Sequence, residues 1–263
     1  MSRIFITGST EGIGRAAARS LLSRGHEVVL HARSKERASA LDDLAAEAAG
    51  IVIGDLRSRA ETRSIAEQVN AIGRMDAVIH NAGIYSQPKR NPTPEGHASI
   101  LSVNTLAPFM LTALIERPQR LVYLSSGLHR NGEGSLRDLD WTERNWDPAR
   151  AYAESKLHVV ALALYLARHW PDVCSNAVDP GWVRTRMGGS AAPVDLETGQ
   201  RTQSWLAASE EPAARISGRY WHHMKAQQPA AEATQPAFQD ALVARLEELT
   251  GVRLAPAEKK APA

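Results

Sequence analysis

The fold is decided by the first strand and turn of the chain, which read Arg3-Ile4-Phe5-Ile6-Thr7-Gly8-Ser9-Thr10-Glu11-Gly12-Ile13-Gly14. The apolar run Ile4–Ile6 predicts a buried strand, and the Ala- and Leu-rich residues 12–24, closed by Gly25, predict a helix. Glycines between a strand and a helix permit a tight turn, where backbone amides and the positive end of the helix favour an anion. This turn is either an ordinary connection or a site for the pyrophosphate of a dinucleotide. Its place after the first strand favours the dinucleotide, with contacts at Gly8, Ser9, Thr10, Gly12, Ile13 and Gly14.

Strands and helices alternate beyond this turn. Short, continuous apolar runs predict strands at residues 27–30, 51–53, 77–79, 121–124 and 173–178. Helical patterns begin at Ser34 and cover residues 61–72, about 94–115, 151–169, 202–207 and 235–249. Strands without polar alternation are typical of parallel sheets that are covered on both faces. We therefore expect a single-domain α/β Rossmann fold, a doubly wound parallel sheet with helices on both faces, over residues 1–254, and a disordered tail at 255–263.

The composition excludes several classes of protein. The 263 residues include 31 Lys plus Arg against 29 Asp plus Glu, with no long basic block, so nothing indicates nucleic-acid binding. The single cysteine, Cys174, excludes an internal disulfide and is typical of a reducing compartment. Met1–Arg3 leaves no room for a signal peptide, and no apolar run approaches the about 20 residues of a membrane helix. We expect a cytoplasmic protein with no membrane or nucleic-acid partner.

The end of the second predicted strand bears on the choice of cofactor, because an acidic residue there would bind an adenosine ribose and repel a 2′-phosphate. The chain has no acid at this point and reads His31-Ala32-Arg33-Ser34. Arg33 can hold a 2′-phosphate by charge-assisted hydrogen bonds, or it can be a solvated arginine at a helix start. Glu11, inside the glycine turn, argues against NADP(H), because its negative charge would be unfavourable close to a 2′-phosphate. We expect NADP(H) as the cofactor, with NAD(H) as the alternative.

A tyrosine and a lysine lie one helical turn apart in Tyr152-Ala153-Glu154-Ser155-Lys156. The pKa of free tyrosine, about 10, is too high for easy proton transfer at neutral pH, and a nearby ammonium group lowers it. Taken alone, such a pair is more often a tyrosine packed beneath a lysine side chain. Its meaning therefore depends on the other motifs of the chain.

Five motifs occur in one order along the chain. They are the glycine turn, Asn81-Ala82-Gly83, Ser125-Ser126, Tyr152 with Lys156, and Pro180-Gly181. Together they resemble the short-chain dehydrogenase/reductase family, from Arg3 to about Tyr220. Three finer features resemble the branch that contains retinol dehydrogenases and related carbonyl reductases: Ser125-Ser126-Gly127-Leu128-His129-Arg130, Asp138-Leu139-Asp140, and Ala151-Tyr152 followed by Ser155-Lys156-Leu157.

The resemblance implies catalytic roles for four residues. Tyr152 would be the general acid in ketone reduction and the base in alcohol oxidation, and Lys156 would bind the nicotinamide ribose and lower the pKa of the tyrosine. Ser126 would hydrogen-bond the substrate oxygen and stabilise developing charge. Ser125 is the poorer choice, because successive residues at a strand end face opposite ways. Asn104, in Val103-Asn104-Thr105, would hold a water in the proton relay.

The resemblance also implies further cofactor contacts. Asp55, beside Leu56, would meet the adenine amino group, unless it caps a helix. The floor under the adenosine ribose would be formed by Asn81, Ala82 and Gly83. The turn beside the nicotinamide would include Pro180, Gly181, Val183 and Thr185.

Two features depart from the family pattern. The insertion, residues 127–151, is long and carries Trp141 and Trp146; it either lines the substrate pocket or packs as surface structure. The helix that carries Asn104 ends early, at Glu116-Arg117-Pro118. That helix commonly forms a dimer interface in the family, so the sequence leaves a homo-oligomer open.

Residues 182–222 are where this fold usually builds its substrate lid. The apolar residues of this region would line an apolar pocket or belong to the core; they are Trp182, Met187, Trp205, Tyr220 and Trp221. His129, His222 and His223 lack the spacing of metal ligands, so we expect surface or loop histidines and no required metal.

These features together predict an oxidoreductase that transfers a hydride between NADP(H) and a small carbonyl or alcohol substrate of apolar character. The alternative is a non-catalytic dinucleotide-binding regulator with the same fold. A sugar-nucleotide epimerase or dehydratase would need a different glycine spacing and a larger C-terminal domain. The sequence does not identify the carbonyl compound.

Overall fold

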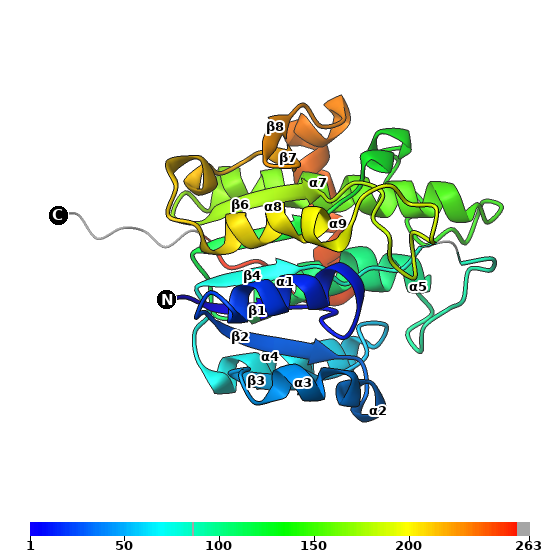
Figure 1. Ribbon diagram of the computed structural model, residues 1–263. Coiled ribbons are helices and arrows are strands. Elements are labelled where there is room, and N and C mark those ends of the chain that lie inside the picture. Colours follow the sequence, from blue (N-terminus) through cyan, green and yellow to red (C-terminus); the bar gives the residue numbers. More distant parts are fainter. Residues whose placement is uncertain (86, 257–263) are drawn as a thin grey trace.

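The computed structural model describes residues 1–85 and 87–256. Its centre is one eight-stranded sheet, in which all neighbouring strands are parallel except the last pair (Figure 1). In spatial order the strands are β3 (Gly50–Ile53), β2 (Glu27–Ala32), β1 (Arg3–Ile6), β4 (Ala77–His80), β5 (Arg120–Leu124), β6 (Cys174–Asp179), β7 (Tyr220–His222) and β8 (Lys225–Gln227). The strand order reverses direction between β1 and β4, so the predicted doubly wound Rossmann sheet is confirmed.

Helices cover both faces of the sheet, and each face has its own core. The first strand shows why, since Phe5 packs into one core while Ile4 and Ile6 pack into the other. One face carries α1 (Gly12–Leu22) and α8 (Leu196–Ala208), which lie side by side in Figure 1. The other face carries α4 (Arg59–Ile72), α6 (Ala107–Leu114), α7 (Pro148–His169) and α9 (Pro236–Thr250).

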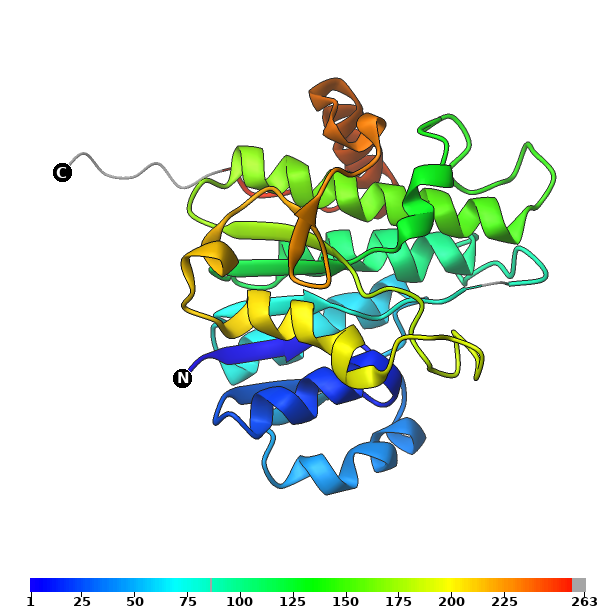
Figure 2. The ribbon, with the colours of Figure 1, turned by 45° about the horizontal axis from the view of Figure 1, so that its top comes forward.

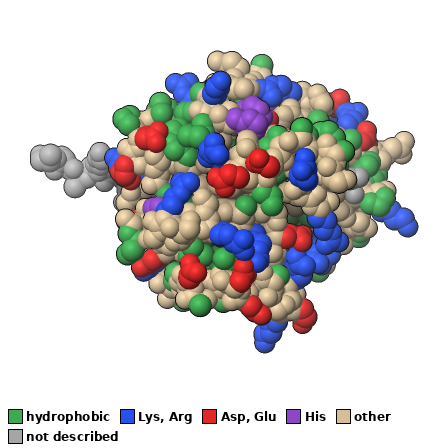
Figure 3. All heavy atoms as spheres, in the orientation of Figure 1, with side chains coloured by type: hydrophobic (Ala, Val, Ile, Leu, Met, Phe, Trp, Pro, Cys, Tyr) green, Lys and Arg blue, Asp and Glu red, His purple; other side chains and the backbone are tan. Residues whose placement is uncertain are grey.

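Shorter helical segments connect these elements. The α-helical ones are α2 (Lys35–Ala38), α3 (Asp42–Ala45) and α5 (Ser99–Leu101). The 3₁₀ segments are η1 (Ser39–Leu41), η3 (Gly127–Asn131), η4 (Pro212–Arg215) and η5 (Ala231–Thr234), and η2 (Ser102–Leu106) is a π-helical segment. Among the described residues, no helix is both long and apolar enough to cross a membrane. Basic and acidic side chains are mixed on the face drawn in Figure 3, in line with the balanced composition.

Some boundaries differ from the sequence prediction. The helix expected from Pro94 begins only at Ser99, because residues 92–98 form a turn that contains Gly96 at a φ of 86°. The hairpin β7–β8 was not predicted, since its strands are three residues long and β8 is exposed and polar; Figure 2 shows it in orange. The tail residues Ala255 and Pro256 accept hydrogen bonds from Arg117, while the rest of the predicted disordered tail lies outside the described residues.

Candidate active site

A cavity of about 320 Å³ opens at the carboxyl ends of the central strands. This is the edge where a doubly wound sheet places its ligands. Most of the predicted cofactor and catalytic residues line it, namely Gly8, Thr10, Gly12, Ile13, Gly14, Arg33, Asp55, Leu56, Asn81, Ala82, Gly83, Tyr152, Lys156, Pro180 and Thr185. The loops that follow six different strands therefore meet in one hollow.

Three predicted cofactor contacts lie outside the lining, as do the predicted catalytic residues Asn104 and Ser126. The Ser9 hydroxyl is buried and donates to the Ile6 carbonyl at 2.6 Å. The Val183 side chain packs against Gly199 of α8. Gly181, at a φ of 81°, lets its amide donate to the Asp179 carboxylate at 2.9 Å. These three residues shape the loops around the cavity through their packing and turn geometry.

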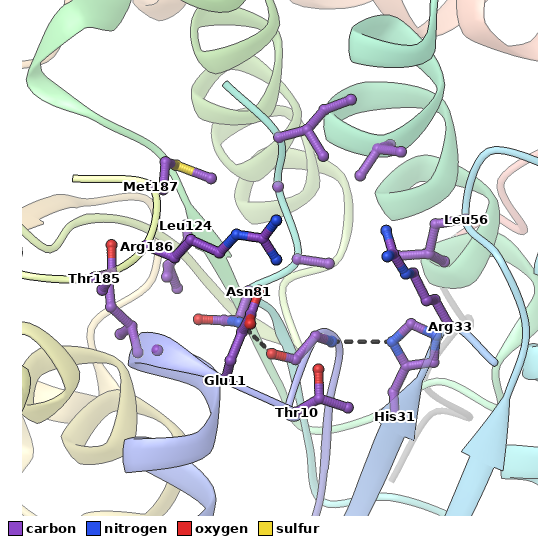
Figure 4. Close-up of a pocket in the computed structure, with 18 of the residues that line it drawn as sticks. Thr10, Glu11, His31, Arg33, Leu56, Asn81, Leu124, Thr185, Arg186 and Met187 are labelled. Carbon is purple, nitrogen blue, oxygen red and sulfur yellow. Dashed lines mark hydrogen bonds between the residues drawn. The ribbon is translucent and has the colours of Figure 1, made fainter. Parts of the chain in front are cut away.

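The glycine turn has the close packing that the sequence pattern predicts. Gly8 and Gly12 have φ values of 68° and 59°, which favour glycine. A Cβ at Gly14 would lie 2.3 Å from the Asn81 amide nitrogen and 2.4 Å from the Gly8 carbonyl oxygen. Asn81 Nδ2 donates to the carbonyls of Thr7 and Gly8 at 3.0 and 3.3 Å (Figure 4). Asn81, from the loop after β4, thus holds the glycine turn in place through two hydrogen bonds.

His31, which no sequence motif marks, lies in β2 and connects the two loops that follow β1 and β3. His31 Nδ1 accepts from the Gly8 amide at 3.0 Å, and its Nε2 lies 2.9 Å from the Gly54 carbonyl oxygen (Figure 4). Because Nδ1 must accept, the ring is the neutral tautomer with its proton on Nε2. Burial lowers the pKa of His31, which favours this neutral form. No local motif marks such a residue, since both partners come from other parts of the chain.

Two ion pairs lie at the end of the cavity that Arg33 and Asp55 line. Arg37 binds Glu11 at 2.9 Å, and Arg57 binds Asp55 at 2.6 Å. Burial opposes ionisation of Asp55, but the hydrogen bonds of Arg57 outweigh it and hold its pKa below the usual value. Asp55 is not a helix cap, because Ser58 caps α4.

Arg33 differs from these paired arginines. It is exposed, lines the cavity, and has no hydrogen-bond or ion-pair partner among the described residues. Figure 4 shows Arg33 and Arg186 reaching toward the cavity from opposite sides. The ion pair with Arg37 compensates the negative charge of Glu11, which in the sequence argued against a phosphate near the glycine turn.

The tyrosine and lysine lie on the buried side of α7, which begins where Asp147 caps it. Lys156 Nζ donates to the Leu124 carbonyl at 2.8 Å and lies 5.6 Å from the centre of the Tyr152 ring. Burial lowers the pKa of Lys156 to about 8. Burial also raises the pKa of Tyr152 to about 12, although a hydrogen bond with Ser126 acts in the opposite direction. Desolvation is thus the largest influence on the pKa of Tyr152, and it opposes the lowering that the resemblance implies for Lys156 to provide.

The two serines after β5 face different ways. Ser125 Oγ donates to the Lys156 carbonyl at 3.0 Å and is buried against α7. Ser126 is half-buried, caps η3 by accepting from the Leu128 amide at 3.2 Å, and influences the pKa of Tyr152. Only the Ser126 hydroxyl is thus placed beside the tyrosine.

Asn104 lies in the π-helical segment η2, a type of irregularity that is frequent at functional sites. Its Oδ1 accepts from the Ile84 amide at 2.8 Å, and its Nδ2 donates to the Ile84 carbonyl at 2.9 Å and to Ser155 Oγ at 3.0 Å. Ser155 in turn donates to the Tyr152 carbonyl at 2.7 Å. Asn104 therefore connects the loop after β4 to α7.

The aromatic residues expected around a substrate lid divide into two groups. Trp205, Tyr220 and Trp221 are buried and belong to the two cores. Trp182 and Met187 are 57% and 49% exposed, and Met187 lines the cavity. Only the second group can present an apolar surface to a ligand.

One of the histidine predictions was wrong. His129 is fully buried rather than at the surface, because its Nδ1 meets the Ser126 carbonyl at 2.7 Å and its Nε2 accepts from the Ala230 amide at 2.9 Å. His222 and His223 are half-buried and stack at 3.9 Å. Among the described residues, no three His, Cys, Asp or Glu side chains are grouped as metal ligands.

Comparisons with known proteins agree with this fold and site. The family model described as "Enoyl-(Acyl carrier protein) reductase" matches residues 8–213. The short-chain dehydrogenase chyC of Penicillium rubens is 41% identical over 97% of this chain and 99% of its own length. Human retinol dehydrogenase 13 is 30% identical over 98% of this chain and 87% of its own length.

Solved structures show the same fold. A crystal structure of a protein from Mycobacterium paratuberculosis has a TM-score of 0.80, 25% identity, and covers 97% of this chain and 95% of that chain. A blue fluorescent protein from a metagenomic library, crystallised with NADPH, has a TM-score of 0.68, 21% identity, and covers 84% and 95%. Fold and site are those of a nucleotide-dependent oxidoreductase. The chain belongs to the short-chain dehydrogenase/reductase family.

Proposed function

We propose that this protein interconverts a carbonyl compound and its alcohol, with NADP(H) as the redox cofactor and Tyr152 as the acid and base. The observation that carries the proposal is that Tyr152 and Lys156 line the same cavity as the glycine turn, with Ser126 hydrogen-bonded to Tyr152. Proton-transferring and nucleotide-binding residues thus share one site. Among the relatives, retinol dehydrogenase 13 acts on an alcohol according to its name, which supports this class of reaction.

The residues of the cavity fit a dinucleotide. The glycine turn offers backbone amides at the start of α1, where the helix dipole favours a pyrophosphate. Gly14 has no room for a side chain, because Asn81 and the Gly8 carbonyl pack against it and hold the turn close to the start of the helix. Pro180 and Thr185 would border the nicotinamide, and Lys156 would bind its ribose. When bound, NADPH would supply the hydride.

The preference for NADP(H) rests on charge. Arg33 is available for a 2′-phosphate, whereas Glu11 and Asp55 are already paired with Arg37 and Arg57. A phosphate that enters this end of the cavity therefore meets three guanidinium groups and two neutralised acids. The NADPH bound to the structurally similar blue fluorescent protein is consistent with this preference.

The protein side chains would handle the proton. Because the pKa of Tyr152 is about 12, its hydroxyl is protonated at neutral pH and can donate to a carbonyl oxygen as that oxygen gains charge. Ser126 would hydrogen-bond the same oxygen and stabilise the charge. The Lys156 ammonium, held by the Leu124 carbonyl, would favour the phenolate once the proton has left.

The substrate would enter from the side of residues 182–222, within a single domain of residues 1–254. Trp182 and Met187 are exposed near the mouth of the cavity and Leu128, after β5, is 42% exposed. Three exposed apolar side chains on neighbouring loops favour an apolar carbonyl compound. We propose a small-molecule substrate of this kind.

The experiment is a panel of ketones and aldehydes assayed with NADPH and with NADH, for the parent and for Tyr152→Phe. Removing the hydroxyl removes the proton donor but keeps the ring, so we expect the rate to fall by about 10²–10⁴-fold. NADPH binding, followed by fluorescence titration, should stay within about threefold of the parent because Tyr152 is only one of many predicted cofactor contacts. Full activity of Tyr152→Phe would refute the mechanism, and NADPH binding without turnover of any carbonyl would indicate a regulator.

A further inference from the structure

Tyr85, in the loop after β4, packs directly against the proposed acid. The two tyrosine rings meet edge to face, with 4.6 Å between ring centres and an angle of 83°. Tyr85 is 38% exposed, while Tyr152 is buried. Tyr85 does not itself line the cavity, but the preceding residue Ile84 does, so a large, partly exposed ring flanks the proposed proton donor next to the cavity. No sequence motif indicated this contact.

The residue before Tyr85 is fixed from the core side. Asn104 forms a pair of hydrogen bonds with the backbone of Ile84, at 2.8 Å to the amide and 2.9 Å to the carbonyl. Asn104 is 1% exposed, so these bonds are shielded from water. The start of the loop therefore cannot move away from α7 without breaking both bonds.

The far side of the same loop is fixed by the insertion, residues 127–151. Trp146 Nε1 donates to the Gln87 carbonyl at 2.8 Å. The Trp146 ring meets Trp141 at 5.8 Å and 72°. Asn104 thus anchors Ile84, and Trp146 of the insertion anchors Gln87, in the loop that carries Tyr85.

The insertion is itself anchored on the helix that carries Tyr152. Glu154 of α7 is 2% exposed, accepts from Trp141 Nε1 at 3.0 Å, and binds the Arg144 guanidinium through both oxygens at 2.6 and 2.8 Å. Arg144 also lies 3.7 Å above the Trp141 ring. Trp141 has a φ of 55°, an unfavourable backbone for a tryptophan that these contacts must outweigh. A chain of contacts therefore runs from α7 through the insertion to the loop of Tyr85.

We propose that Tyr85 sets the size of the carbonyl compound accepted beside Tyr152, and that the insertion maintains this limit through Trp146. The inference rests on the proposed carbonyl chemistry and adds the residue that selects the substrate. None of residues 127–151 lines the cavity, so the insertion acts on selectivity by positioning Tyr85.

The test compares two ketones that the parent reduces, one with a small and one with a bulky second substituent, at saturating NADPH. Tyr85→Ala removes the ring and should shift the ratio of kcat/KM values toward the bulky ketone by roughly tenfold. Tyr85→Phe keeps the ring and should keep the ratio. Trp146→Phe removes the hydrogen bond to Gln87 together with part of the indole ring, and it should shift the ratio in the same direction as Tyr85→Ala, by a smaller factor.

Trp170→Phe is the matched control for Trp146. Trp170 Nε1 also donates to a backbone carbonyl, that of Ala255 at 2.9 Å, at the opposite end of α7. This variant should keep the parent ratio, which separates selectivity from a general loss of stability. An unchanged ratio in Tyr85→Ala would overturn the inference while leaving the carbonyl chemistry intact. Failure of the parent to reduce any ketone in a broad panel would overturn both.

Discussion

At the residue scale, Arg33 differs from its neighbours Arg37 and Arg57 because both of those arginines form ion pairs. Arg37 and Arg57 are engaged by carboxylates, and each pair is close to neutral. A neutral pair adds little to the attraction of a phosphate, whereas an unpaired guanidinium keeps its full charge and all its donors. Discrimination between the two nicotinamide cofactors should therefore depend on Arg33 in particular.

Replacing Arg33 by Gln should weaken the binding of NADPH by roughly tenfold to a hundredfold, the value of one or two charge-assisted hydrogen bonds. The affinity for NADH should change by less than about threefold, because NADH has no 2′-phosphate. Fluorescence titration of both cofactors measures the two dissociation constants. The exposed Arg63→Gln on α4 serves as the control for a change in overall charge. Equal loss of both affinities in Arg33→Gln would contradict the assignment.

At the scale of elements, the connection from β1 to α1 is rigid because its parts interlock. Gly14 touches the Asn81 amide and the Gly8 carbonyl, while His31 holds the Gly8 amide from the other side. These contacts hold the turn in one arrangement. Pre-organisation of this kind removes part of the entropy cost of binding a pyrophosphate.

Gly14→Ala should destabilise the protein by about 1–3 kcal/mol, since the new methyl group would overlap two neighbours, and should abolish most of the dinucleotide affinity. Gly25→Ala is the matched change: its φ is 78°, but nothing lies within 4 Å of the added carbon. It should cost about 1–2 kcal/mol from backbone strain alone and leave binding unchanged. Urea denaturation and cofactor titration measure both effects. Parent-like binding by Gly14→Ala would show that the turn is less constrained than its contacts imply.

The elements also show what the sequence could predict. The six strands β1–β6 and the long helices are predictable because their residues are apolar in uninterrupted or periodic runs, as in Ile4–Ile6. Helix α7 begins at Pro148, three residues before the predicted start, and α8 extends well beyond residues 202–207, because caps such as Asp147 and Asp195 lie outside the apolar pattern. The β7–β8 hairpin depends on pairing with β6, which no local signal records.

For the candidate site as well, the local motifs were predictable from the sequence and the long-range contacts were not. Its motifs are short and local, so the glycine turn, Ser126, Tyr152 and Lys156 could be found in the sequence. The contacts of Tyr85 with Tyr152, and of Glu11 with Arg37, join residues that lie 67 and 26 positions apart. Such contacts depend on tertiary packing, and the elevated pKa of Tyr152 follows from that packing as well.

At the scale of the whole molecule, two buried histidines couple folding to pH. His80 and His158 are 3% and 2% exposed, and burial lowers the pKa of each to about 3. An unfolded histidine has a pKa of about 6.5. Between pH 6.5 and about 3 the unfolded chain therefore binds more protons than the folded protein does, so the free energy of unfolding falls as the pH falls.

Each of these histidines should lower the free energy of unfolding by up to about 1.4 kcal/mol for every pH unit below pH 6.5. His158→Leu removes one contribution, and neither ring nitrogen of His158 has a hydrogen-bond partner to lose among the described residues. Urea denaturation at pH 7 and pH 5 should show that the free energy of unfolding falls less in this variant than in the parent. His169→Gln, at the partly exposed end of α7, should retain the parental dependence. Identical pH dependence in His158→Leu and the parent would disprove the coupling.

The enclosure of α7 restricts which segments of this protein can be replaced without disturbing the fold. From Ala151 to Ala163 every residue of this helix is buried, with β5 and β6 on one side and the insertion and α9 around the rest. Segments with this degree of enclosure open only when the whole molecule unfolds. Tyr152 and Lys156 therefore belong to its most durable part, whereas Tyr85, Trp182 and Met187 lie on loops at the edge. A new substrate can be accommodated by exchanging an edge loop, with the proton chemistry left in place.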